Sequence, residues 1–140
     1  MPGRLRRRAL GYPVPNLLSG YAVLTLNQYL QIGMPTGPGE LTGIMLWSSL
    51  NVATIFYNMW INVLADGVAH MNSVWRDYVM IPTNYTAHGL FSTDDMLAAD
   101  VVNSSMFIPV PYESTCTVTL TNKVAGNLTL VWCVLGRTGA

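Results

Sequence analysis

Hydrophobic and polar positions alternate along most of this chain with a period of two, the spacing of a β-strand with one buried face. The alternation is sharpest in residues 54–64, TIFYNMWINVL. One face of this segment is apolar and aromatic and consists of Ile55, Tyr57, Met59, Ile61 and Val63. The opposite face carries Thr54, Asn58 and Asn62, with Phe56, Trp60 and Leu64 between them. The pattern predicts a strand over residues 53–64.

A membrane helix is the alternative for this region, because no charged side chain occurs between Glu40 and Asp66 and the stretch is long enough to cross a bilayer. Three features favour strands. The run contains WSSLNVAT, which is turn-prone and costly in hydrocarbon. It ends in Asp66-Gly67, a strong turn signal, and its flanks have no Lys or Arg to orient a span. We therefore expect two strands, 41–48 and 53–64, joined by a short turn.

Other segments show the same alternation. We expect further strands at residues 20–33, 74–81, 87–91 and 105–110. The last of these carries prolines near its end, which suits an edge strand. Residues 93–99 follow a serine and begin with Thr-Asp-Asp, a helix N-cap pattern with acids in the first turn, and predict one short helix.

The end of the chain predicts a hairpin of residues 114–121 and 128–135. Matching the apolar faces pairs Val118 with Trp132 and Leu120 with Leu130, and a shift by one residue would place threonines opposite the apolar row. In this register Cys116 lies on the core face and Cys133 on the opposite face, so we expect two unpaired thiols. Two cysteines alone do not make a structural zinc site.

About eight short strands with almost no helix predict an all-β fold, an antiparallel β-sandwich or barrel. The 140 residues most simply form one domain. We place this domain at residues 19–140, after an extended basic arm at residues 1–18 that mixes Gly, Pro and Arg without any period.

The composition changes the picture from a free monomer to an assembling chain. Hydrophobic residues make up 51% of the sequence and charged residues only 10%, against about 25% charged in average proteins. Such a chain leaves much of its surface uncharged. We therefore expect lasting contacts with other chains.

The formal net charge of zero conceals an asymmetry between the arm and the body. Four of the seven basic residues lie in the first eight positions, which leaves three basic residues against seven acidic ones in the body. We expect the arm to dock on a neighbouring subunit through Arg4, Arg6, Arg7, Arg8, Leu10, Tyr12, Leu17 and Leu18. The alternative partner of the arm is nucleic acid, whose phosphates arginine side chains bind.

Catalytic patterns are absent from the sequence. His70 and His88 sit in no metal-binding spacing, and Asp94-Asp95 fits a helix start better than a pair of catalytic carboxylates. There is no nucleophile elbow and no phosphate-binding loop. We therefore expect no enzyme activity, no cofactor and no metal.

Five aromatic residues are candidates for a subunit contact, where Trp and Tyr are enriched. They are Trp47, Trp60, Trp75, Tyr78 and Tyr85. The alternatives are that they fill the core, or that they stack on sugar rings in a lectin-like adhesion module.

A series of short motifs runs along the chain and consists of Gly39, Leu41, Ile44, Asp66, Gly67, Glu113, Ser114, Val118, Asn122 and Gly136. In their order these motifs resemble the small jelly-roll proteins of phage and virus particles. The likeness covers about two thirds of the chain, and residues 68–106 depart from the pattern. It implies a jelly-roll-like sandwich in a structural protein of the virion, either a capsid decoration (cementing) protein or a minor capsid protein.

The resemblance also implies partners and a location. Proteins of this kind commonly form homo-oligomers, often trimers, on a lattice of a major capsid protein. We therefore expect the chain in the virion after synthesis in the host cytoplasm, with no role at a membrane.

Overall fold

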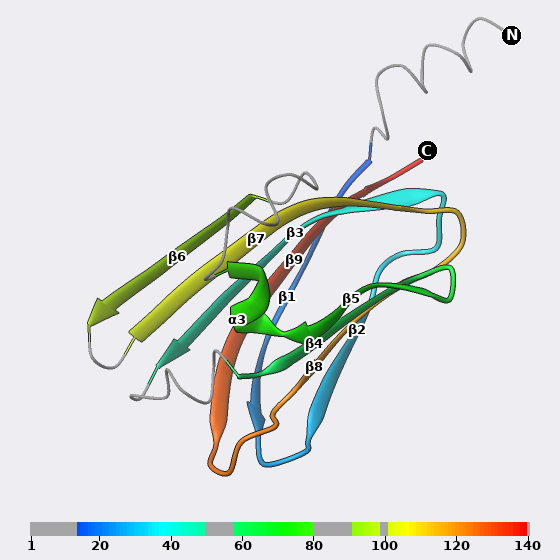
Figure 1. Ribbon diagram of the computed structural model, residues 1–140. Helices are drawn as coiled ribbons and strands as arrows, with labels where there is room; N and C mark the ends of the chain where they lie inside the picture. The colour runs from blue at the N-terminus through cyan, green and yellow to red at the C-terminus, as the bar shows by residue number, and fades with distance from the viewer. Residues whose placement is uncertain (1–13, 50–57, 80–90, 99–100, 140) are drawn as a thin grey trace, which may run out of the picture.

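The structure is a computed structural model that describes residues 14–49, 58–79, 91–98 and 101–139 (Figure 1). In these ranges the chain forms nine strands in two antiparallel sheets and one short helix. The all-β sandwich expected from the sequence is confirmed.

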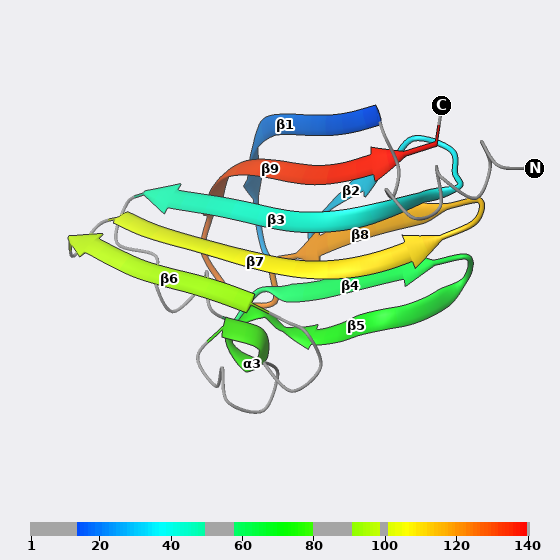
Figure 2. The same ribbon diagram turned by 90° about the horizontal axis from the view of Figure 1, so that it is seen from above.

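Sheet A has five strands in the order β1 (Val14–Leu24), β9 (Leu128–Thr138), β3 (Gly39–Ser49), β7 (Val101–Tyr112) and β6 (Phe91–Ala98). Sheet B has four strands in the order β2 (Tyr29–Gly33), β8 (Cys116–Thr121), β4 (Trp60–Ala65) and β5 (Val68–Val74). Figure 2 shows sheet A in front, with sheet B behind it.

The strands pair in nested order, which is the topology of a jelly roll. β4 pairs with β5, β3 with β7, β2 with β8 and β1 with β9. The chain thus resembles one long hairpin that is rolled up, so that strands joined by a single connection usually enter opposite sheets. β6 is an additional strand, which pairs with β7 at the margin of sheet A.

The tip of the innermost hairpin is the turn Asp66-Gly67, as the sequence predicts. Both residues have positive φ, 52° and 81°, and they connect the paired residues Ala65 and Val68. A two-residue loop with both φ values positive is the type I′ turn, whose twist matches that of the flanking strands.

The Asp66 carboxylate also binds the loop between β7 and β8. It accepts hydrogen bonds from the backbone N–H groups of Glu113 at 2.7 Å, Ser114 at 2.8 Å and Thr115 at 3.0 Å. These donors stabilise the ionised form and hold the pKa of Asp66 below its ordinary value. Two of the motifs behind the resemblance, Asp-Gly and Glu-Ser, therefore form one structural contact.

Asn122 joins the other end of the sandwich in a similar way. Its side-chain amide is fully buried and donates to the carbonyl oxygens of Leu24 at 2.9 Å and Gly126 at 2.8 Å. Its Oδ1 atom accepts from the backbone N–H of Val124 at 3.0 Å. Every hydrogen-bonding group of a buried amide is thereby used to fix two loops.

The core lies between the sheets and contains alternate residues of most strands. Its buried side chains include Leu41, Ile44, Leu46, Met106, Leu128 and Leu130 from sheet A and Ile61, Val63, Met71, Val118 and Leu120 from sheet B.

The helix α3 (Trp75–Val79) closes the core at the side where β5 and β6 lie (Figure 1, Figure 2). Trp75 is fully buried, its indole N–H donates to the Ser104 hydroxyl at 2.8 Å, and its backbone N–H donates to the Met59 carbonyl at 2.7 Å. A large ring can be buried here because its polar group has a partner. Within the described residues, no helix has the length and apolarity needed to cross a membrane.

The predicted hairpin of residues 114–121 and 128–135 is wrong, because the two strands lie in different sheets. Val118 pairs with Ile32 and Val63, whereas Trp132 pairs with Gly20 and Leu46. Period-two alternation identifies the buried face of each strand but does not say whether two apolar faces share a sheet or meet across a core. The thiols follow the prediction, since Cys116 is buried, Cys133 is partly exposed and both are free.

Two adjacent segments have the opposite structure to the one predicted. Residues 75–79, expected inside a strand over 74–81, form α3, and the Ser73 hydroxyl donates to the Asp77 carboxylate at its start. Residues 91–98 form β6, although the sequence predicts a helix near 93–99. A local cap signal is weak, and the ladder between β6 and β7 overrides it.

Strand β7 is not an edge strand as predicted, because it lies between β3 and β6. Its prolines explain the discrepancy. Among the described residues, the ladder with β6 ends at the pair of Phe91 and Phe107, so Pro109 and Pro111 lie where β3 is the one described strand paired with β7. Proline is tolerated there because no second ladder needs its missing N–H.

Three boundaries also differ from the prediction. Residues 20–33 are divided between β1 and β2 in separate sheets, with residues 25–28 as the connection. The strands expected at 41–48 and 53–64 correspond to β3 and β4 in separate sheets, and residues 50–57 lie outside the described ranges. Strand β1 begins at Val14, so residues 14–18, which we assigned to the arm, pair with β9. Most of the strand expected at 87–91 lies outside the described residues.

Candidate interaction surface

The outer face of sheet A is apolar, which is unusual for the solvent side of a sandwich. Its apolar side chains come from β1, β9, β3 and β7, and we call this set the apolar face. It consists of Leu17, Tyr21, Val23, Met45, Trp47, Phe107, Val131, Cys133 and Leu135. All of them are exposed or half-buried, whereas their neighbours along β9 and β3 point into the core.

The strand registers place these residues in continuous rows. Tyr21 lies opposite Val131, which lies opposite Trp47 on the next strand. In a second row, Leu17 lies opposite Leu135. Neighbours in such rows lie roughly 5 Å apart between Cβ atoms, so the rows form one surface and not scattered apolar atoms.

Two side chains of the apolar face are largely exposed. Leu17 is 65% exposed and Tyr21 is 67% exposed, while Trp47, on the middle strand of sheet A, is 37% exposed. An open depression of about 380 Å³ next to Leu17 is lined in addition by Pro15, Thr42, Leu135 and Arg137. A partner could fill such a hollow with an apolar side chain.

The charges of β1, β9 and β3 lie at one end of the apolar face. Glu40 and Arg137 are directly opposite each other on β3 and β9, beside the ends of those strands. Between this pair and the other end of the sheet, the described outward side chains of the three strands carry no ionised group.

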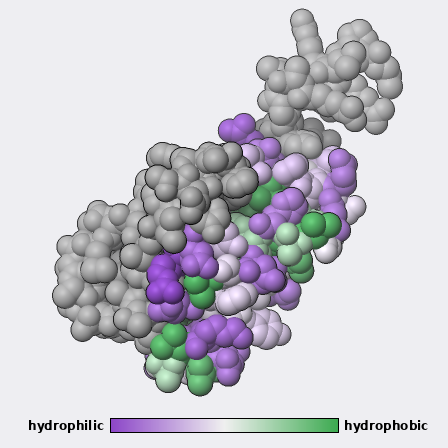
Figure 3. Space-filling view, in the orientation of Figure 1, coloured by the Kyte–Doolittle hydropathy of each residue, from purple (hydrophilic) through white to green (hydrophobic). Residues whose placement is uncertain are grey.

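The exterior of sheet B is more polar than that of sheet A, although Tyr29, Leu64 and Val68 are exposed on its strands. Thr119 lies opposite Gln31 and Asn62 on its outer face. The Trp60 indole N–H donates to Asn72 Oδ1 at 2.8 Å, so even the large ring here is part of a polar network. Figure 3, which shows the side of the molecule seen in Figure 1, has hydrophilic and hydrophobic residues interspersed over its coloured surface. The contrast singles out sheet A as the surface that needs a partner.

The five aromatic candidates do not form one surface. Trp47 belongs to the apolar face, Trp60 lies on the outer face of sheet B, and Trp75 is in the core. Tyr78 packs partly buried against the core, and its hydroxyl accepts a hydrogen bond from the backbone N–H of Asn72 at 3.0 Å. Tyr85 lies outside the described residues. Trp75 is therefore removed from the expected subunit contact because its ring is not accessible.

The residues of the predicted arm are divided in the same way. Leu17 is on the apolar face, while Leu18 points inward and packs partly buried against the core. Arg4, Arg6, Arg7, Arg8, Leu10 and Tyr12 lie outside the described residues.

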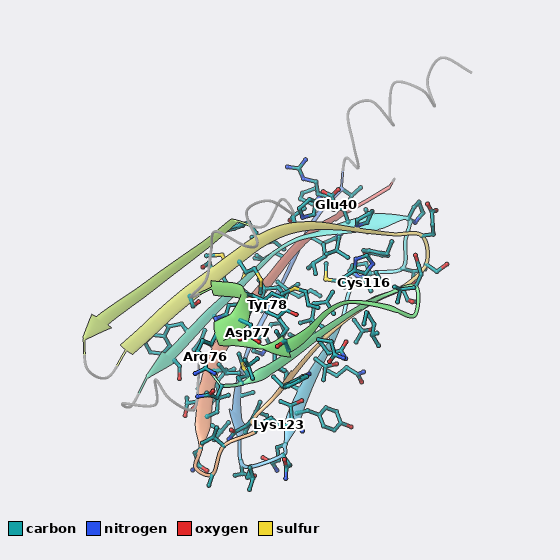
Figure 4. The ribbon with its side chains drawn as sticks, viewed as in Figure 1. Glu40, Arg76, Asp77, Tyr78, Cys116 and Lys123 are labelled. Atoms are coloured by element: carbon teal, nitrogen blue, oxygen red, sulfur yellow. The ribbon has the colours of Figure 1, made fainter. Side chains whose placement is uncertain are left out.

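The described part of the chain has no cluster of three His, Cys, Asp or Glu side chains that could hold a metal ion. Figure 4 shows Glu40, Lys123 and the pair Arg76 and Asp77 at three separate places. Burial raises the pKa of the Cys116 thiol to about 11, and desolvation also raises the pKa of Cys133, so both thiols are protonated at neutral pH. Neither is an activated nucleophile.

Tyr21, Met45, Val131 and Leu135 were not among the residues singled out from the sequence. A signal for Val131 and Leu135 exists, because strand 128–135 is apolar at positions 131, 133 and 135 as well as at the even positions that form its core face. A strand with two apolar faces inside an antiparallel sandwich indicates a second buried contact.

Several residues behind the resemblance have structural roles. A Cβ atom at Gly39 would lie 2.7 Å from the Arg137 carbonyl oxygen, and one at Gly136 would lie 2.8 Å from that of Glu40, because β3 and β9 approach closely there. Comparison of the chain with protein-family models gives no match, and comparison with curated proteins gives none either.

Proposed function

We propose that this chain is a non-enzymatic structural protein of a virus particle. In this proposal it cements a capsid lattice as a homo-oligomer and buries the apolar face of sheet A against other protein. The observation that carries the proposal is the uncharged apolar surface across β1, β9 and β3, on the outside of a fold whose other sheet has a more polar exterior.

The physical argument concerns water. Exposed apolar area costs about 25 cal/mol per Å², and free monomers rarely carry a large continuous patch of it. Interface centres, in contrast, are depleted in charge and enriched in Trp, Tyr and Met. Tyr21, Trp47 and Met45 on adjacent strands of one sheet meet this description.

The placement in a virion is supported by the jelly-roll topology together with the motif resemblance. Jelly rolls are frequent in capsids, but they also occur in lectins and enzymes, so topology alone does not fix the function. In the proposal, the arm at residues 1–13 reaches from the start of β1 to a neighbouring subunit, and its four arginines pair with acidic side chains there.

Cys133 provides a direct test, because it lies in the middle of the apolar face opposite Met45. Its alkylation should be slow in concentrated protein and should accelerate on dilution, as the face becomes uncovered. A Gln31→Cys variant, on the outer face of sheet B, should react at the same rate at all concentrations. Alkylation of Cys133 that does not depend on concentration would contradict a buried face.

Electron microscopy of the same samples distinguishes the roles in a particle. A cementing protein should give small oligomers of defined size, which bind to the surface of shells formed by a lattice protein. Closed particles that contain nucleic acid would instead indicate a capsid protein with an arm that binds the packaged strand.

A further inference from the structure

The free edge of sheet A is unusually well suited to strand pairing. The described neighbour of β1 is β9 alone, and the ladder between them runs through all eleven residues without a bulge. Within the described residues, no strand pairs with the other margin of β1. An open edge of this kind is a template for pairing with another strand.

Natural sandwiches protect such edges with charges, bulges or short strands. The other described edge strands have these devices: β2 has five residues, β5 has a register shift at its ladder with β4, and β6 has a shift and contains Asp94 and Asp95. β1 is long, regular and uncharged, and Pro15 near its start is the one protective residue. Protection is therefore lacking at a single edge.

We propose that β1 pairs antiparallel with β1 of a second copy of this chain, so that two sheets A become one continuous sheet. The inference rests on the proposed function and supplies one contact of the homo-oligomer, the edge of sheet A, while the joined apolar faces are covered by other protein. The pair has two-fold symmetry and gives an even number of copies, whereas the resemblance predicts trimers.

The sequence of β1 is self-complementary in this arrangement. Full overlap of the two strands puts Ser19, the middle residue, opposite Ser19 of the second copy. Leu17 then lies opposite Tyr21, on both sides of the axis. These are the most exposed apolar side chains of the apolar face, at 65% and 67%, and an aromatic ring opposite an aliphatic side chain stabilises a pair of strands.

The inward side chains of β1 fit as well. Leu18 lies opposite Gly20 of the second copy in this register, so a large residue meets a small one. Gly20 is itself covered by the Trp132 ring, since a Cβ atom there would lie 2.6 Å from it. The two rings thus lie near the junction of the two cores and continue the packing across it.

The charges of the candidate segments favour β1 of a second copy over residues 1–13 as the partner of β1. Residues 1–13 are long enough to pair with β1, but they carry four arginines and β1 has no acidic residue to balance them. A second β1 is uncharged and has the same length. Pairing also joins the two apolar faces into one larger surface.

Cysteine cross-linking tests the arrangement. All variants carry Cys133→Ser, which removes the thiol opposite position 19 of the same chain. Each variant has one new cysteine, in place of Leu17, Ser19, Tyr21 or Val23. A chain with Gln31→Cys serves as control. Cys116 is 1% exposed and does not interfere. A short thiol cross-linker should convert Ser19→Cys almost completely to covalent dimers.

The other positions should follow the register. Moving the cysteine two residues from the axis separates the two copies by about 13 Å along the strands, so Leu17→Cys and Tyr21→Cys should each cross-link at least tenfold less. Mixed together at concentrations above the dissociation constants that these substitutions raise, the same two variants should form heterodimers, because position 17 lies opposite position 21. Val23→Cys and the control should remain single chains.

The result that would overturn β1 pairing is an oligomer that shows no cross-link at position 19 and no mixed cross-link between positions 17 and 21. The proposed function would stand in that case. Protein that is a single copy at all concentrations would overturn both. Efficient cross-linking at position 19 together with the mixed pair supports β1 pairing.

Discussion

Tyr21 and Tyr29 provide a matched test of the difference between the two sheets. They are 67% and 65% exposed, both lie on the outer side of a strand, and they belong to β1 of sheet A and β2 of sheet B. We expect Tyr21→Ser to weaken self-association strongly. Tyr29→Ser should leave it unchanged, because the exterior of sheet B is not the proposed contact.

The size of the effect follows from the exposed area. A Tyr side chain buries roughly 150–250 Å² when it is fully enclosed, so two thirds of it amounts to roughly 100–170 Å². At about 25 cal/mol per Å² its burial in an interface is worth about 2.5–4 kcal/mol per chain. A tenfold change in dissociation constant corresponds to about 1.4 kcal/mol. The variant should therefore raise the dissociation constant at least fifty-fold.

Sedimentation equilibrium over a wide range of concentrations measures this change, and circular dichroism and thermal unfolding show whether both variants remain folded. Equal dissociation constants for Tyr21→Ser and the unmodified chain would refute the reasoning, as would an equal loss of association in Tyr29→Ser.

Four further results are expected. Trp132→Ala should lower the free energy of unfolding by about 3 kcal/mol in denaturant titrations. This is the low end of the range for buried Trp, because the ring is half-buried. An unchanged unfolding midpoint would show that the ring does not pack in the core. The lowered pKa of Asp66 means that the ionised carboxylate stabilises the fold above the ordinary pKa of 3.8, and this stabilisation is lost as pH falls through the folded pKa. The free energy of unfolding of Asp66→Asn should therefore depend less on acid pH than that of the parent. Identical pH profiles would contradict this. Cys116 should resist alkylation at pH 8 until the chain unfolds, whereas Cys133 in dilute protein should react, and mass spectrometry of the labelled peptides checks the order. Deleting residues 1–13 should leave the sandwich folded and abolish its binding to shells. Added salt should weaken the binding of the full chain steeply only if the arm binds nucleic acid.

The faces of the strands could be predicted from the sequence, because burial imposes a period of two on each strand separately. Cys116, Val118 and Leu120 are buried as expected. The partner of each strand could not be predicted in this way. In a jelly roll β8 and β9 are joined by a short connection yet meet across the core, and alternation looks the same in both arrangements.

The local signals at residues 74–81 and 93–99 failed for a different reason. α3 has five residues and is fixed by the burial of Trp75 between the sheets, so tertiary packing decides its conformation more than helix propensity does. The apolar face was inferred only in general terms, from the low charge content, because its residues on β1, β9 and β3 become neighbours only through strand pairing.

The mass of the purified chain in solution tests the central claim most directly. Sedimentation velocity at micromolar concentration should give a defined species of more than one copy, and it should dissociate when Tyr21 is replaced by Ser. A stable single copy of 15.3 kDa at every concentration, with the outer face of sheet A open to solvent, would contradict the account.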